Sequence, residues 1–111
     1  MKILLVGGAG YIGSHVALQF LERGDQVGIF DNLSTGLKSN VDKRARFFEG
    51  DIQQYEHIAS VLEEGWDAVI HLAAYKAAGE SMVAPEKYSN NNISGSLNLI
   101  AACSKAKVKN F

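Results

Sequence analysis

The stretch "VGGAGYIGSH", residues 6–15, places four glycines within seven positions and constrains the fold more than any other part of the chain. Its first glycine directly follows residues 1–6, which are apolar except for Lys2. Its last residues belong to the segment 11–23, in which apolar side chains recur at helical spacing. A short, continuously apolar run is typical of a strand buried on both faces. The sequence therefore predicts a buried strand, a glycine-rich turn and a helix in direct succession.

Strand and helix patterns continue to alternate along the chain. Further strands are predicted at residues 26–31, 45–51 and 66–74, further helices at residues 55–62 and 85–105, and the start of a fifth strand at residues 108–111. Gly24 ends the first helix, and Asp51 followed by Gln54 predicts a capping box that opens the second. Together these patterns predict an α/β fold. We expect a Rossmann-type, doubly wound parallel sheet with helices on both faces, incomplete at four strands plus the start of a fifth.

Three of the glycines, Gly7, Gly10 and Gly13, stand three residues apart at the predicted junction of strand and helix. Gly7 would permit the tight turn, Gly10 would let a diphosphate approach the backbone, and Gly13 would let the helix pack closely on the sheet. A Walker-type phosphate loop is excluded because no Gly-Lys-Ser/Thr follows. The alternative is a tight connection that binds no ligand.

An acidic residue, Asp31, ends the second predicted strand. In a dinucleotide-binding unit, a carboxylate at this point accepts hydrogen bonds from the adenosine ribose and repels a ribose phosphate. Asp31 therefore favours NAD over NADP as the cofactor. The alternative is that Asp31 is a simple turn or cap residue.

The G-x-x-G-x-x-G spacing resembles the extended short-chain dehydrogenase/reductase superfamily. Within it, "GGAGYIGSH", "DNLSTG", "GDI", "AVIHLAAYKAAGES", "NNNISGSLNLI" and "VKNF" are similar to the UDP-glucose 4-epimerase family. The resemblance extends in order over essentially all of the 111 residues. Its most discriminating stretch is "HLAAYKAAGES", because many sugar-nucleotide dehydratases and epimerases share the glycine turn.

The resemblance implies which residues bind NAD. They are Gly7, Gly10, Tyr11, Ile12 and Gly13 for the diphosphate turn, Asp31 and Asn32 for the ribose, Asp51 and Ile52 for the adenine, and Leu72, Ala73, Ala74, Lys76 and Asn91 along the rest of the cofactor. Two positions depart from the family pattern: Val6 stands where threonine is usual, and Ser94 where asparagine is common. Asp51 could instead be only a helix cap, and Lys76 only a solvated loop residue.

The family's chemistry requires a tyrosine with a lysine four residues later, together with a serine. Residues four positions after Tyr11, Tyr55, Tyr75 and Tyr88 are His15, Ala59, Gly79 and Asn92, so none of the tyrosines forms this pair. We therefore expect the N-terminal, cofactor-binding portion of a sugar-nucleotide epimerase, with no catalytic residue and no activity of its own. A nucleotide-sugar dehydratase and a catalytically silent NAD-binding module are the alternatives.

Composition and charge limit the kinds of partner and metal site that this chain can have. The net charge of −1, from 11 basic and 12 acidic residues, provides no global field for nucleic acid or an anionic membrane. Cys103 is the only cysteine, which excludes an intrachain disulfide and fits the cytoplasm. His15, His57 and His71 lack the spacing of a metal site, so we predict none. The resemblance implies a UDP-sugar substrate and a homodimer for the full-length enzyme.

Overall fold

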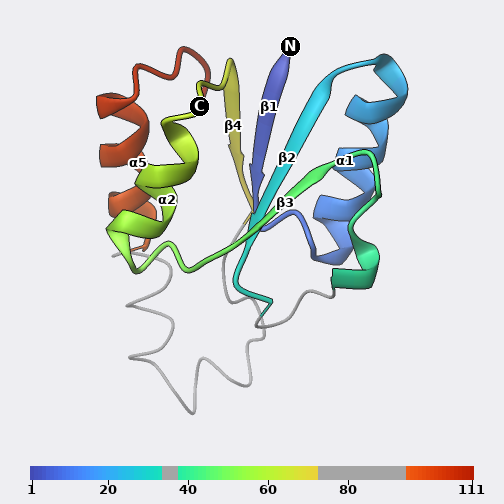
Figure 1. The fold of residues 1–111 in the computed structure, drawn as a ribbon, viewed down its shortest axis with the longest axis horizontal. Helices are drawn as coiled ribbons and strands as arrows, with labels where there is room; N and C mark the ends of the chain where they lie inside the picture. Colours follow the sequence, from blue (N-terminus) through green and yellow to red (C-terminus); the bar gives the residue numbers. More distant parts are fainter. Residues whose placement is uncertain (34–37, 73–94) are drawn as a thin grey trace.

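The structure is a computed structural model that describes residues 1–33, 38–72 and 95–111. Within these ranges a four-stranded sheet runs in the order β3-β2-β1-β4. Its strands are β1 (Lys2–Val6), β2 (Gln26–Asp31), β3 (Arg46–Glu49) and β4 (Ala68–His71). All described pairings are parallel. The amino ends of the strands lie at the top of Figure 1 and the carboxyl ends at the bottom.

Helices cover both faces of this sheet (Figure 1). α1 (Tyr11–Arg23) lies on one face, and α2 (Tyr55–Leu62) and α5 (Gly95–Lys105) lie together on the other. A short 3₁₀ turn, η1 (Lys38–Asn40), precedes β3. The predicted α/β fold with a doubly wound parallel sheet is therefore confirmed.

The two faces of β1 belong to two separate hydrophobic clusters. Ile3 and Leu5 pack with Ala17 of α1, whereas Leu4 and Val6 pack with residues of α2 and α5. Successive side chains of a strand point to opposite faces, so a strand buried on both sides must be apolar throughout. Each fully buried aliphatic side chain contributes roughly 1.5–3 kcal/mol of transfer free energy, which makes β1 the centre of the fold.

Of the two helix caps predicted from the sequence, the structure contains one. As predicted, α1 ends at Gly24, whose φ of 96° is left-handed and whose N–H donates to the carbonyl oxygens of Phe20 and Leu21. The predicted capping box at Asp51 and Gln54 is wrong. Gln54 is the N-cap residue of α2 and makes no side-chain cap. The Asp51 side chain instead accepts a hydrogen bond from the Gln53 N–H within the preceding turn, at 2.9 Å.

Two strands are shorter than predicted. β3 ends at Glu49, before Gly50 and Asp51, and β4 spans only Ala68–His71, so that Trp66, Asp67 and Leu72 lie outside it. The predicted fifth strand begins as expected. Asn110 forms one parallel bridge with Ala68, and its carbonyl oxygen accepts the Val69 N–H at 2.9 Å. The chain thus returns beside β4, at the edge of the sheet opposite β3.

α5 is apolar on more than one side. Leu99, Ala102 and Cys103 are buried against α2 and the sheet, whereas Leu97 and Ile100 are 62% and 50% exposed. Burial raises the pKa of the Cys103 thiol to about 11, so it is protonated at neutral pH. Over the described residues, no helix has the length and apolar character needed to cross a membrane.

Candidate functional site

The glycines between β1 and α1 are required for different reasons. Gly7 has a φ of 93°, a conformation that favours glycine and turns the chain out of β1. A Cβ at Gly13 would lie 2.6 Å from the Gly7 carbonyl oxygen, so the start of α1 packs directly on the turn. Gly10 has an ordinary φ of −78°, and the only described atom within 4 Å of a Cβ there would be the Gly7 carbonyl oxygen, at 3.7 Å. The described part of the fold therefore does not require glycine at position 10.

The start of α1 presents backbone N–H groups beside this open position. Gly10 is the N-cap residue and offers no side-chain cap, and the first turn contains no acidic residue. The first intrahelical bond runs from the Ser14 N–H to the Gly10 carbonyl, so the amides of Tyr11 and Ile12 precede it. The side chains of Tyr11 and Ile12 are 78% and 55% exposed. This helix terminus has the chemistry to bind an anion.

Asp31, at the end of β2, is buried and joins two turns. Its Oδ2 accepts the Ala9 N–H at 3.0 Å, and its Oδ1 accepts the Leu33 N–H at 2.7 Å. Its backbone carbonyl accepts the Gly50 N–H at 3.1 Å. Asp31 is therefore a turn residue, as the alternative interpretation held. Each carboxylate oxygen nevertheless has a second lone pair, so a role in turn geometry and a role in ligand binding are compatible.

The two peptide groups that flank Ala9 are both held by side chains. The Ala9 N–H donates to Asp31, and the Ala9 carbonyl oxygen accepts a hydrogen bond from Asn40 Nδ2 at 3.2 Å. The Ala9 side chain is fully buried. Sequence reasoning missed Asn40, because an asparagine within a polar loop carries no signal of a contact 31 residues away.

The turn after β3 contains the predicted adenine-binding residues. Asp51 Oδ1 accepts the Gln53 N–H, and the Asp51 N–H donates to His57 Nδ1 at 3.1 Å. The Ile52 side chain is only 3% exposed and packs against Gly95 of α5. A ligand at this turn would therefore meet the Asp51 carboxylate and the backbone of Ile52, not the Ile52 side chain.

The remaining predicted residues continue along the same edge. Asn32 follows β2 and is half-buried. Leu72 follows β4 and donates its N–H to the Val6 carbonyl at 2.7 Å. Ala73, Ala74, Lys76 and Asn91 lie outside the described residues.

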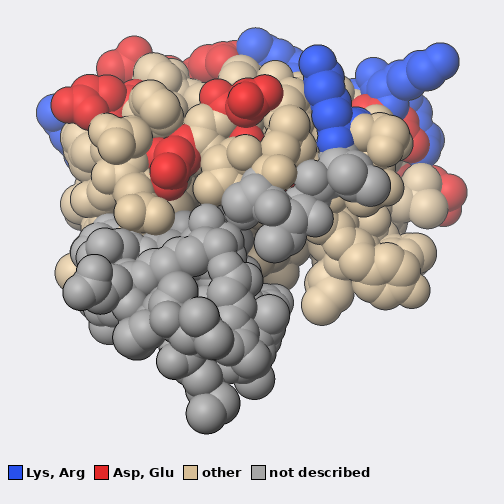
Figure 2. Space-filling view, turned by 90° about the horizontal axis from the view of Figure 1, so that it is seen from below, with Lys and Arg blue, Asp and Glu red and all other residues tan. Residues whose placement is uncertain are grey.

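The predicted residues that the structure describes thus follow the carboxyl ends of all four strands. Figure 2 views the molecule from this side. The described surface shows acidic side chains at the upper left and centre and basic side chains mainly at the upper right, so no single charge dominates it. Within the described ranges, no cluster of His, Cys, Asp or Glu could hold a metal ion.

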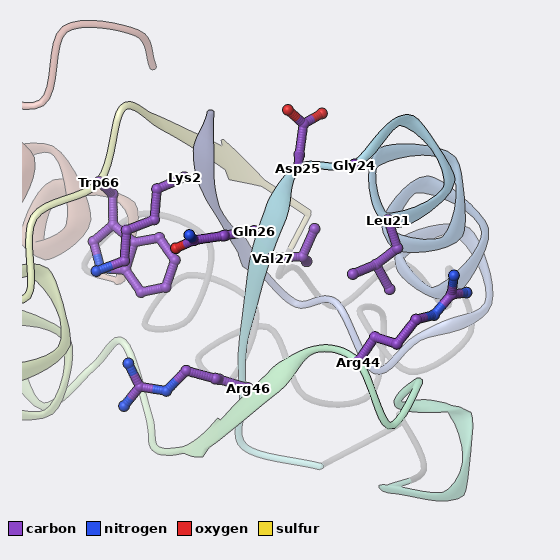
Figure 3. A pocket seen from close by; sticks show the side chains of 9 residues that line it. All are labelled: Lys2, Leu21, Gly24, Asp25, Gln26, Val27, Arg44, Arg46 and Trp66. Atoms are coloured by element: carbon purple, nitrogen blue, oxygen red, sulfur yellow. The ribbon is translucent and has the colours of Figure 1, made fainter.

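A described pocket of about 430 Å³ lies at the opposite edge, near the amino ends of the strands. Figure 3 shows Lys2 and Trp66 on one side of β2 and Leu21 and Arg44 on the other. The cations that line it are already engaged. Lys2 Nζ donates to the Glu64 carbonyl at 2.9 Å, and Arg44 pairs with Asp42 at 2.9 Å. This pocket contains none of the predicted site residues, so we do not assign the cofactor to it.

Comparison with known proteins agrees with this geometry. The family model described as "NAD dependent epimerase/dehydratase family" matches residues 3–111. A UDP-glucose 4-epimerase of Klebsiella pneumoniae is 43% identical over 119 residues, which cover 100% of this chain and 86% of the relative. A Thermotoga maritima UDP-glucose 4-epimerase solved with UDP-glucose superposes with a TM-score of 0.95 at 38% identity, over 98% of this chain and 36% of that one.

This chain is much shorter than most of these relatives. A Lactobacillus helveticus UDP-glucose 4-epimerase is 43% identical over 110 residues, which are 98% of this chain and 33% of the relative. The chain thus spans about a third of the length of such relatives. The resemblance found in the sequence is confirmed.

Proposed function

Because the chain belongs to the NAD dependent epimerase/dehydratase family, we propose that residues 1–111 bind NAD at the carboxyl ends of β1, β2, β3 and β4. The observation that carries this proposal is Gly10. The fold fully explains Gly7 and Gly13, but no contact within the described residues explains why position 10 bears no side chain. A diphosphate lying against the backbone would explain it.

The other described residues fit NAD as well. The amides of Tyr11 and Ile12 would bind the diphosphate, and Asp31 and Asn32 the adenosine ribose. Asp51 and the Ile52 backbone would bind the adenine, and Leu72 would lie along the cofactor. The negative charge of Asp31 would oppose a 2′-phosphate and so favour NAD over NADP. NAD, when bound, supplies a hydride acceptor for oxidation of a sugar hydroxyl.

At the level of the whole protein, we propose that this chain is the N-terminal cofactor-binding portion of a sugar-nucleotide epimerase that interconverts UDP-glucose and UDP-galactose. The support is the family membership together with relatives named UDP-glucose 4-epimerase. The sequence contains no tyrosine followed four residues later by lysine. In this proposal the acid–base pair and the sugar-binding domain therefore belong to the part of the relatives that these residues do not match.

We also propose that the parent enzyme is a cytoplasmic homodimer. The exposed Leu97 and Ile100 on α5 form an apolar stripe that a second subunit could cover. The cytoplasmic location rests on the single cysteine, whose thiol is buried and free.

Replacement of Gly10 by valine tests the NAD proposal. In the chain titrated with millimolar NAD and followed by ¹⁵N–¹H NMR, we expect shifts at the Tyr11 and Ile12 amides, and we expect Gly10→Val to abolish them by blocking the diphosphate. Among the described residues, a Cβ at position 10 would make only an ordinary contact with the Gly7 carbonyl oxygen, at 3.7 Å, so the folded spectrum should persist. Gln26→Val is the control, because Gln26 is exposed, lies in a strand, where valine is favoured, and is at the amino-end edge. Unchanged NAD shifts in a folded Gly10→Val chain would refute the assignment.

A further inference from the structure

Asn98 links α5 to the turn after β3. Its Nδ2 donates to the Ile52 carbonyl oxygen at 2.9 Å and to the Gln53 carbonyl oxygen at 3.1 Å. A side-chain amide has two N–H bonds, and both are used here. Carbonyl oxygens only accept, so this geometry requires the nitrogen of the amide to face the turn. The contact spans 46 residues of sequence, and nothing in the turn itself replaces it.

The Ile52–Gln53 peptide is thereby fixed at both ends. Asn98 holds its carbonyl oxygen, and Asp51 Oδ1 holds its N–H at 2.9 Å. The orientation of the peptide and that of the carboxylate are therefore coupled. Oδ2 of Asp51 has no partner among the described residues and can accept a donor from a ligand.

Helix packing places Asn98 at this point. Gly95, three residues earlier on the same face of α5, lies against Ile52, and a Cβ there would approach Ile52 Cδ1 to 2.7 Å. A larger residue at position 95 would require the Ile52 side chain to move. Gly95 and Asn98 together therefore dock α5 onto the Asp51–Gln54 turn.

We propose that Asn98 is a positioning residue that sets the Asp51 carboxylate to recognise the exocyclic amino group of adenine. This inference rests on the proposed NAD site. An amino group donates to a carboxylate, whereas hypoxanthine carries a carbonyl oxygen at the same position and would be repelled. Asn98 would thus act on base selectivity without touching the ligand.

Two substitutions separate this role from simple stabilisation. Asn98→Asp preserves size but places an oxygen against two carbonyl oxygens, so the Ile52–Gln53 peptide should turn away and release Asp51. Asn98→Ala removes the donor without adding repulsion. Asn110→Asp is the matched control, because Asn110 Nδ2 also donates to a backbone carbonyl, that of Asp67 at 3.2 Å, but at the amino-end edge.

The experiment compares dissociation constants for NAD and for its hypoxanthine analogue by NMR titration of the chain. The chain should prefer NAD, and Asn98→Ala and Asn98→Asp should reduce this preference by about fivefold to tenfold, the loss typical of one hydrogen bond. Hydrogen exchange at the Gln53 amide should accelerate in both variants. Asn110→Asp should preserve the preference and the protection.

The outcomes distinguish this inference from the proposed function. If the unmodified chain binds neither dinucleotide, the proposed NAD site and the role of Asn98 are both refuted. If it binds both equally, or if folded Asn98 variants bind more weakly but keep the same preference, the NAD site stands and the role of Asn98 is refuted. Should Asn98→Asp fail to fold, the preference of Asn98→Ala decides.

Discussion

Acidic residues make different contacts at the two ends of the strands, called here the carboxyl-end edge and the amino-end edge. At the carboxyl-end edge, the side chains of Asp31 and Asp51 accept hydrogen bonds from backbone amides. At the amino-end edge, Asp25 pairs with Arg23 at 2.7 Å and with the N-terminal amine at 2.9 Å, and Glu64 pairs with Arg46. At the amino-end edge Asp25 and Glu64 are thus paired with cations, and Asp67 accepts the Lys2 N–H at 2.8 Å. At the carboxyl-end edge Asp31 and Asp51 are oriented by the main chain.

This difference determines what each edge can bind. A carboxylate that is already paired with a cation has little attraction left for a ligand, and exposed pairs contribute only about 0–1 kcal/mol to stability. A carboxylate oriented by N–H donors keeps its charge and its spare lone pairs for hydroxyl or amino groups. Asp31 and Asp51 therefore keep lone pairs that a ligand can use, whereas Asp25 and Glu64 belong to a charge-balanced surface.

The largest difference between the two edges should be in the free energy of unfolding when a glycine is replaced. Gly13→Ala places a Cβ 2.6 Å from the Gly7 carbonyl oxygen and the Gly8 Cα, which forces the turn to move. Overpacking costs about 1–3 kcal/mol, and the upper end, about 3 kcal/mol, applies here because the atoms met are backbone atoms. Alanine gains back about 1 kcal/mol in a helix. We therefore expect a net loss of about 2 kcal/mol in the free energy of unfolding, measured by urea denaturation.

Gly24→Ala is the matched control at the amino-end edge. A Cβ there meets nothing within 4 Å, so only the left-handed φ of 96° opposes it. The expected cost is about 1 kcal/mol. If Gly13→Ala were no more destabilising than Gly24→Ala, the tight packing of α1 on the turn would be wrong.

A second contrast concerns charge. Asp31→Asn preserves size but removes the charge opposing a 2′-phosphate, and it leaves one oxygen to serve the Ala9 and Leu33 amides. NAD should therefore bind more weakly, and the gap between NAD and NADP should narrow by about 1–3 kcal/mol. Asp25→Asn, at the other edge, should leave both affinities unchanged. Isothermal titration with the two cofactors checks this. Equal affinities for NAD and NADP in the unmodified chain would contradict the role of Asp31.

How far the sequence predicts this molecule depends on the range of each contact. The bounds of α1 and β2 follow from local patterns of glycine spacing and apolar runs, and both were predicted correctly. Asp51 was misassigned as a cap because an aspartate that caps a helix and one that closes a turn look alike in sequence. Asn40 and Asn98 were missed because their partners lie 31 and 46 residues away. Helical spacing predicted α5 but did not indicate which of its faces is buried, since apolar residues occupy more than one side.

The smallest expected effect is the pH dependence of a surface pair near the amino-end edge. Hydrogen bonds from the Arg44 side chain, and then from its backbone N–H, lower the pKa of Asp42 from 3.8 to about 2. Because the pKa is depressed in the folded state, the stabilisation is complete above about pH 4 and is lost as the pH falls toward 2. Asp42→Asn should therefore be slightly less stable than the unmodified chain at pH 6, should differ less from it at pH 2, and should be equally stable at pH 1, in urea denaturation at each pH. Added salt should shrink the difference at pH 6, since the pair is exposed. A difference as large at pH 2 as at pH 6 would show that Asp42 stabilises the chain by some means other than its charge.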